Sequence, residues 1–116
     1  MTQLSREQVL QIVEAARVRG EKPELFGADL GEAELLRAKL GGTNLSEAKL
    51  IKTNLSQANL SQANLGEANL RQANLKGAKL RQANLSGANL SATKYDQATG
   101  WPANFDPTQT GANRED

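Results

Sequence analysis

The chain has 116 residues, enough for one domain, and its formal net charge at neutral pH is only +1. Hydrophobic residues make up 38% of it but aromatic residues only 3%, so a conventional core would be thin. The absence of cysteine and histidine excludes disulfides and thiolate chemistry, and it removes the commonest general base and metal ligand.

The first segment, residues 1–22, is predicted to be an amphipathic helix. Ser5 and Gln8 have the spacing of a capping box, and Gly20 can end the helix. One face of this helix would carry Val9, Ile12, Val13 and Ala16. We expect the helix, together with Phe26, to cover the first coil of the repeat that follows. The alternative is a helix that binds a partner.

Residues 23–97 form the main predicted element, in which leucine returns at every fifth position and Tyr95 takes the last one. An α-helix turns about 100° per residue, so steps of five would scatter the leucines around it. A flat strand would place successive leucines on opposite faces. The repeat of leucine starts at Leu25. The leucines that we expect to form the core are Leu30, Leu35, Leu40, Leu45, Leu50, Leu55, Leu60, Leu65, Leu70, Leu75, Leu80, Leu85 and Leu90.

A small residue in each pentad indicates how the chain must bend. Alanine or threonine stands two residues before nearly every repeated leucine, and only Pro23 breaks this pattern. Inward positions therefore alternate between spacings of two and three. A spacing of two is typical of a strand, and the extra residue must turn the chain so that the next leucine points inward. Regular bends predict a closed coil, and successive coils can stack at about 4.8 Å.

The pentad Ala58-Asn59-Leu60-Ser61-Gln62 matches the pattern A-(D/N)-L-x-x, and most neighbouring pentads repeat it. Over about residues 23–97 the sequence therefore resembles the pentapeptide-repeat family, and it is similar to small members abundant in cyanobacteria. The resemblance implies an all-β solenoid, a right-handed quadrilateral β-helix of about four coils, here with an N-terminal capping α-helix. Lysine replaces the usual Asn or Asp at Lys39, Lys49, Lys79 and Lys94.

The last segment, residues 98–116, is predicted to be a C-terminal cap that ends in a mobile tail. Large rings do not fit a leucine-filled coil, but they can cover its open end. The aromatic residues expected to do so are Tyr95, Trp101 and Phe105. The alternative is a homodimer contact, because related gyrase-inhibiting members of the family use their C-terminal ends. The polar finish of the chain favours a monomer.

A group of cations, which we call the basic belt, is the most suggestive surface feature. It comprises Arg71, Lys76, Lys79 and Arg81 within one predicted coil, with Lys94 below. No acidic residue stands between Glu67 and Asp96, so the belt could attract an anionic partner. The aromatic residues with which nucleic-acid grooves stack bases are missing, which favours an ordinary solvated face.

Catalysis is not expected. Ser46 to Lys49 and Ser91 to Lys94 match the Ser-x-x-Lys motif of serine β-lactamases. That motif needs its serine at a helix start in a cleft, whereas these serines would begin turns of a solenoid. There is no evident pair of catalytic carboxylates and no glycine-rich phosphate motif. We therefore expect no enzyme, no cofactor, no metal and no small-molecule substrate.

The sequence predicts a non-catalytic scaffold that binds another protein through its outward turn residues. No run of about 18 apolar residues is present, so we expect a cytoplasmic protein without a membrane partner. One alternative is anion or nucleic-acid binding through the basic belt. Another is weak modulation of DNA gyrase, although the family members with that activity are long and strongly acidic.

Overall fold

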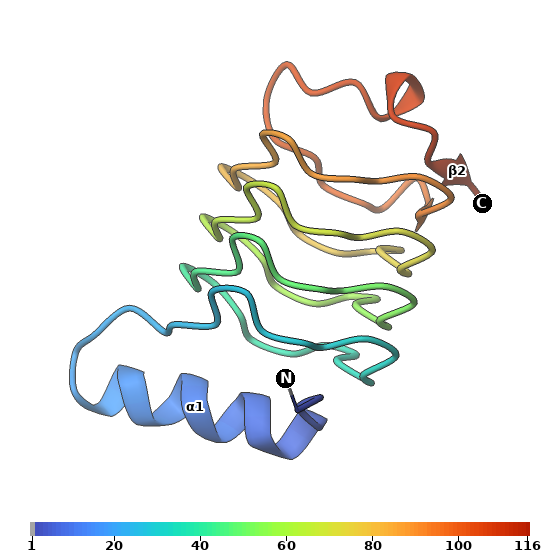
Figure 1. Ribbon diagram of the computed structural model, residues 1–116. Helices are drawn as coiled ribbons and strands as arrows, with labels where there is room; N and C mark the ends of the chain where they lie inside the picture. The colour runs from blue at the N-terminus through green and yellow to red at the C-terminus, as the bar shows by residue number, and fades with distance from the viewer. Residues whose placement is uncertain (1) are drawn as a thin grey trace.

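The computed structural model describes residues 2–116 and shows one helix set against a stack of coils (Figure 1). The elements follow in the order α1 (Arg6–Val18), β1 (Lys94–Tyr95), the 3-10 helix η1 (Pro107–Gln109) and β2 (Asn113–Arg114). The helix lies at one end of the stack, and the C-terminal segment lies at the other. The principal extents are 38 × 27 × 23 Å, so the stack is only moderately elongated.

Parallel bridges between residues twenty apart define the coil. Glu24 pairs with Asn44, Asn44 with Asn64, and Asn64 with Asn84. The same spacing recurs on the other walls, so one coil contains four pentads and each pentad supplies one wall. One residue per wall forms a bridge because turns lie on both sides of it. The expected β-solenoid is confirmed, and among residues 2–116 only β1 and β2 reach two residues.

The bend in each pentad is made by the two residues after the leucine. In one example, Ala33 N–H donates to the Leu30 carbonyl at 3.0 Å, and Glu32 has a φ of 60°. These are features of a type II turn, whose third residue requires positive φ. The preceding asparagine closes the turn, as where Asn54 Oδ1 accepts from Ser56 N–H at 3.0 Å. Lysine at this position has no acceptor atom and cannot do the same.

The core is a column of leucines surrounded by small residues. The exposed fraction of the repeated leucines ranges from 0% at Leu30 to 9% at Leu85, so all of them point inward, as the spacing argument required. Some inward positions are threonines. Thr53 Oγ1 donates to the Leu30 carbonyl of the preceding coil at 2.6 Å, so this hydroxyl is buried but paired. Thr43 is buried as well, and its hydroxyl has no hydrogen-bond partner among residues 2–116.

Local sequence signals fix both ends of α1. Gln8 N–H donates to Ser5 Oγ at 3.2 Å, and Ser5 N–H donates to Gln8 Oε1 at 2.9 Å, which completes the predicted capping box. At the other end, Gly20 has a φ of 70°, and its N–H donates to the Arg17 carbonyl at 2.9 Å. Glycine adopts this left-handed conformation without steric cost, so the helix stops there.

The buried face of α1 packs on the first coils, but two residues predicted to contribute to this cap do not. Val9 and Val13 are buried, whereas Ile12 is 36% exposed. With about 100° per residue, Ile12 lies about 60° to one side of Val9 while Val13 lies about 40° to the other, so Ile12 falls at the edge of the contact. Phe26 is 57% exposed. It is the first turn residue after Leu25, a position that faces outward in every pentad.

Two arginines of α1 bond directly to the open edge of the solenoid. Arg6 Nη1 donates to the carbonyls of Glu34 at 2.9 Å and Leu36 at 2.8 Å. Arg17 Nη2 donates to the Gly41 carbonyl at 3.1 Å. Backbone acceptors that would otherwise lack a partner are thereby satisfied, and the helix is held over the first coil.

The C-terminal segment closes the opposite end. β2 runs parallel to β1, with Lys94 opposite Asn113 and Tyr95 opposite Arg114. The rings of Tyr95, Trp101 and Phe105 form a connected cluster, with centroid separations of 5.4 Å and 5.1 Å. Trp101 and Phe105 are half-buried against the core, and Tyr95 is buried. The last residues take part in the ladder, and the mobility of the tail stays a prediction.

Within residues 2–116, no helix combines the length and the apolar character needed to cross a lipid bilayer.

Candidate functional site

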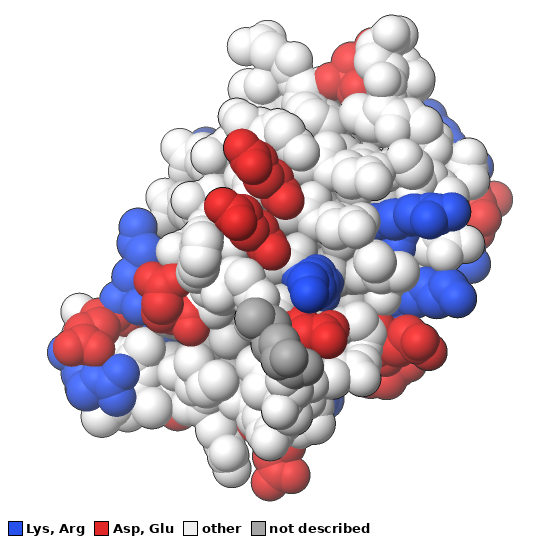
Figure 2. Space-filling model, in the orientation of Figure 1, with Lys and Arg blue, Asp and Glu red and all other residues white. Residues whose placement is uncertain are grey.

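The outer surface consists of columns in which turn residues of successive coils lie one over another. On the face drawn in Figure 2, basic and acidic side chains are interspersed. Gln62 Nε2 donates to Gln82 Oε1 at 3.1 Å, and Arg37 Nε donates to Gln57 Oε1 at 2.5 Å. Both pairs are twenty residues apart, which is one coil. A surface feature is therefore made of residues that share a column or occupy neighbouring columns.

The basic belt does not form a single patch. It occupies three successive walls, with Arg71 on the first, Lys76 and Lys94 on the second, and Lys79 and Arg81 on the third. Lys76 Nζ also forms an ion pair with Glu115 Oε1 at 3.1 Å, so part of the charge is neutralised by the C-terminal segment. The sequence grouped these residues correctly within one coil, but the structure does not bring them to one face.

A different set of cations converges between α1 and the coils. The groove there, which we call the α1 groove, has a volume of about 320 Å³. Its lining residues are Arg6, Leu10, Val13, Glu14 and Arg17 from the helix, and Arg37, Ala38 and Lys39 from the coil. Leucine, valine and alanine supply apolar surface, and four cations and one acid supply the charged groups.

The groove follows from the geometry of its two sides. Arg6, Leu10 and Arg17 lie on one flank of α1, beside the stripe that contains Val13. On the coil, Arg37 has a φ of 59° and occupies an outward turn. Arg6 and Arg17 already donate to edge carbonyls, which fixes them at the junction. A guanidinium carries five N–H donors, so both still have donors to offer.

The electrostatics of the groove are one-sided. Four cations and one glutamate leave its lining with a net charge of +3. Across residues 2–116 the ion pairs involve other residues, namely Arg19 with Glu21, Lys76 with Glu115 and Arg114 with Asp116. The groove cations are therefore not neutralised by a neighbouring carboxylate. Sequence reasoning missed this group because its members come from separate segments, although two cations beside the apolar stripe of the helix were a usable signal.

A second hollow, of about 560 Å³, lies at a corner of the coils near β2. Its lining residues are Lys52, Asn54, Gln72, Asn74, Ala92, Lys94 and Asn113. It contains one belt residue, Lys94, and is mostly lined by amides. Ala92 is its one aliphatic side chain, so this hollow offers little apolar surface to a ligand.

The serines of the two Ser-x-x-Lys matches serve the turns. Ser46 Oγ donates to Asn44 Oδ1 at 2.7 Å, and Ser91 N–H donates to Asn89 Oδ1 at 2.9 Å. Both serines follow a leucine on a wall, so neither begins a helix as the motif requires. In the described part of the chain, no group of three or more acidic side chains is placed to bind a metal ion.

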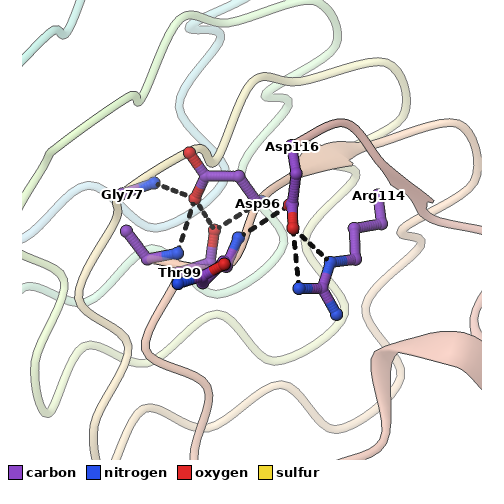
Figure 3. A network of polar contacts seen from close by, with 7 residues as sticks. Gly77, Asp96, Thr99, Arg114 and Asp116 are labelled. Atoms are coloured by element: carbon purple, nitrogen blue, oxygen red, sulfur yellow. Dashed lines mark hydrogen bonds and ion pairs between the residues drawn. The ribbon is translucent and has the colours of Figure 1, made fainter.

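A polar network near the C-terminus ties the tail to the coils (Figure 3). Asp96 Oδ1 accepts from Gly77 N–H at 3.0 Å and lies 3.2 Å from the Thr99 hydroxyl. Arg114 Nη2 donates to Asp116 Oδ2 at 2.7 Å. This hydrogen bond is the main reason that the pKa of Asp116 is lowered from its ordinary value. The network consists of bonds that complete the fold, and it leaves no open acidic site.

Comparison with known proteins agrees with the repeat. The family model described as pentapeptide repeats matches residues 24–62 and 53–91, with 8 copies of the repeat. No protein of curated function matches the sequence.

Three solved cyanobacterial structures illustrate the likeness. The pentapeptide repeat protein alr5209 from Nostoc PCC 7120 is 33% identical, with 99% of this chain and 100% of that chain covered and a TM-score of 0.47. HetL from Nostoc sp. strain PCC 7120, which is involved in the regulation of heterocyst differentiation, is 38% identical over 66% of this chain and 38% of HetL, with a TM-score of 0.62. Rfr23 from Cyanothece 51142 is 43% identical over 67% of this chain and 56% of its own, with a TM-score of 0.45. This chain therefore spans less than two thirds of HetL and of Rfr23.

Proposed function

The chain belongs to the pentapeptide-repeat family, and on this premise we propose that it is a non-catalytic scaffold that binds another protein through the outer faces of its coils. Proteins of this family are generally non-enzymatic repeat scaffolds. The observation that carries the proposal is that the inward and outward positions of each pentad hold different types of residue. Leucine, alanine and threonine occupy nearly all inward positions, whereas the turns carry a mixture of charged, amide, serine and glycine residues with a few apolar ones. Chemical variety is therefore found where a partner could contact it.

The proposal includes the finer architecture that the family implies. The coils would form a right-handed quadrilateral β-helix of about four coils, with α1 as its N-terminal cap. The bridges between residues twenty apart and the burial of Val9 and Val13 support this description. We also propose that the chain works as a monomer, since chain segments cover both ends. Light scattering coupled to size-exclusion chromatography would contradict this if it gave the mass of a dimer.

Affinity capture tests the scaffold function. The immobilised chain is incubated with extract of the cells that produce it, and retained proteins are identified and quantified. We expect one or a few proteins to be retained and to be lost when outward turn residues are replaced. Retention of none at physiological salt, or unchanged retention by a chain with all four walls altered, would contradict the proposal.

The basic belt supports a second function, the binding of an anion or a nucleic acid. Weak modulation of DNA gyrase is a separate alternative. The supporting observation is the run of five cations from Arg71 to Lys94 without an intervening acid. If the belt binds DNA, affinity must fall steeply with salt because binding releases counterions. Absence of DNA binding at low salt would exclude the belt, and absence of supercoiling inhibition would exclude gyrase modulation.

A further inference from the structure

We propose that the α1 groove is the docking site for an acidic peptide segment of a partner protein, and that an aliphatic side chain of this segment rests on the floor of the groove. This inference rests on the proposed scaffold function and names both the surface and the chemistry of the partner. The groove lies beside α1, and its Lys39 is on the same wall as Lys79 of the belt but two coils from it.

Charge complementarity is the first argument. Arg6, Arg17, Arg37 and Lys39 line the groove, with Glu14 as the one opposing charge. None of the four cations forms an ion pair with another described residue. A basic surface of this kind favours carboxylates on the partner, and each guanidinium can bind a carboxylate through two parallel hydrogen bonds.

The floor of the groove is the second argument, because charge alone would not distinguish a peptide from a simple anion. Leu10 is partly buried against the core, and Val13 and Ala38 are buried beside it. Apolar surface between charged rims fits a segment in which an aliphatic residue is flanked by acids. The volume of about 320 Å³ is at the lower end of the range for ligand sites, so the groove suits a short segment.

Preorganisation is the third argument. Arg6 bonds to two edge carbonyls and Arg17 to one, so their guanidinium groups are held beside the wall before a partner arrives. Less side-chain freedom is lost on binding when the groups are already fixed. Arg37 is also held, through its bond to Gln57. The hollow near β2 has no comparable apolar floor, and the cations of the belt do not lie on one face. Neither therefore combines apolar surface with converging cations.

The test measures binding of a labelled synthetic peptide, Asp-Glu-Leu-Glu-Asp, by fluorescence anisotropy. The altered chain carries Arg37→Gln and Lys39→Gln, which leaves the two helix arginines and their backbone bonds in place. The matched control carries Arg71→Gln and Lys79→Gln, one arginine and one lysine of the belt. We expect the groove variant to bind about tenfold more weakly and the belt variant to change less than twofold, since only the groove variant loses two ion pairs with the peptide. Thermal melts verify that both variants are folded.

A second peptide, in which serine replaces the leucine, tests the floor. We expect it to bind several-fold more weakly than the leucine peptide, and inorganic phosphate at equal charge not to compete. Equal binding of the two peptides, equal losses in the two variants, or no binding of the leucine peptide at low salt would each overturn the docking site.

Affinity capture with the same variants separates the two proposals. If the groove variant retains the same proteins as the unaltered chain, the scaffold function stands and the groove proposal fails. If the unaltered chain retains no protein, the scaffold function itself fails.

Discussion

The two ends of the solenoid differ in the hydrogen-bonding groups that they expose. Between coils, Leu25 N–H donates to Asn44 O and Gly27 N–H to Ser46 O, while Asn44 N–H donates back to Pro23 O. Each wall thus gives two donors to the following coil and receives one. The N-terminal edge is therefore rich in carbonyl acceptors, and the C-terminal edge is rich in N–H donors.

Each end is covered by groups of the complementary kind. At the N-terminal edge, Arg6 and Arg17 supply N–H donors, and arginine has no acceptor that would be left unpaired. At the C-terminal edge, the Gly100 carbonyl accepts from Leu80 N–H at 2.7 Å, and the Asp96 carboxylate accepts from Gly77 N–H at 3.0 Å. The direction of the hydrogen bonds between coils therefore determines which side chains can close each end.

Replacement of Val9 by aspartate should have the largest effect on this comparison. Val9 is buried under the first coil, so the charge would have no partner, and we expect a loss of about 3 to 5 kcal/mol in the free energy of unfolding. Phe105→Asp at the other end should cost about 1 to 2 kcal/mol because this side chain is only half-buried. Urea denaturation followed by circular dichroism measures both. Equal losses would mean that the two caps contribute alike.

Replacement of Arg6 by methionine tests the donors at the N-terminal edge. The aliphatic stem is retained while two hydrogen bonds to carbonyls are lost, so we expect about 1 to 2 kcal/mol of destabilisation. Arg19→Met is the control, because the exposed Arg19 side chain pairs with Glu21 and, within residues 2–116, forms no hydrogen bond to an edge carbonyl. The same denaturation experiment applies. A loss no greater than that of the control would show that water satisfies the edge carbonyls equally well.

Thr43 and Thr53 offer a smaller comparison between the first coil and the interior. Both are buried, but Thr43 Oγ1 has no hydrogen-bond partner among residues 2–116. The carbonyl that Thr53 uses lies 23 residues earlier, and for Thr43 that position is Gly20, which ends α1. We expect Thr43→Val to be neutral or stabilising by up to about 1 kcal/mol, and Thr53→Val to cost about 1 kcal/mol. Differential scanning calorimetry measures the stability of each variant. Destabilisation by both substitutions would contradict this account.

Acid should loosen the C-terminal tail, and this is the smallest expected effect. Hydrogen bonds from Thr108 lower the pKa of Asp106, and those from Arg114 lower the pKa of Asp116, both from an ordinary value of 3.8. A lowered pKa means that these carboxylates stabilise the folded tail above about pH 3.8 and lose this effect as pH falls through their folded values. Amide chemical shifts around Asn113 should therefore change as the pH falls below about 3.8. Asp116→Asn should weaken this change, and unchanged shifts around Asn113 down to the pH at which the whole chain unfolds would contradict it.

The sequence predicted the interior because the residues that bend the chain and the leucine that points inward belong to the same pentad. Leu60 points inward through the bend made by its own neighbours, so spacing alone assigns it. Ile12 and Phe26 were assigned wrongly because their burial depends on how the helix is rotated over the coil and on which turn position faces out. The α1 groove depends on both sides at once, with Arg17 and Lys39 brought together only by packing, and no local pattern encodes that contact.

The twenty-residue coil also constrains how such a gene can grow. Insertion of a single pentad would keep the leucines inward, but it would rotate everything downstream by a quarter turn. If the insertion lay between them, Gln62 would no longer face Gln82, and every pair of stacked outer residues that spans the insertion would change. Duplication of twenty residues would lengthen the molecule with each column in phase. The fold can accept insertions of five residues, whereas an outer binding surface is preserved only by insertions of twenty.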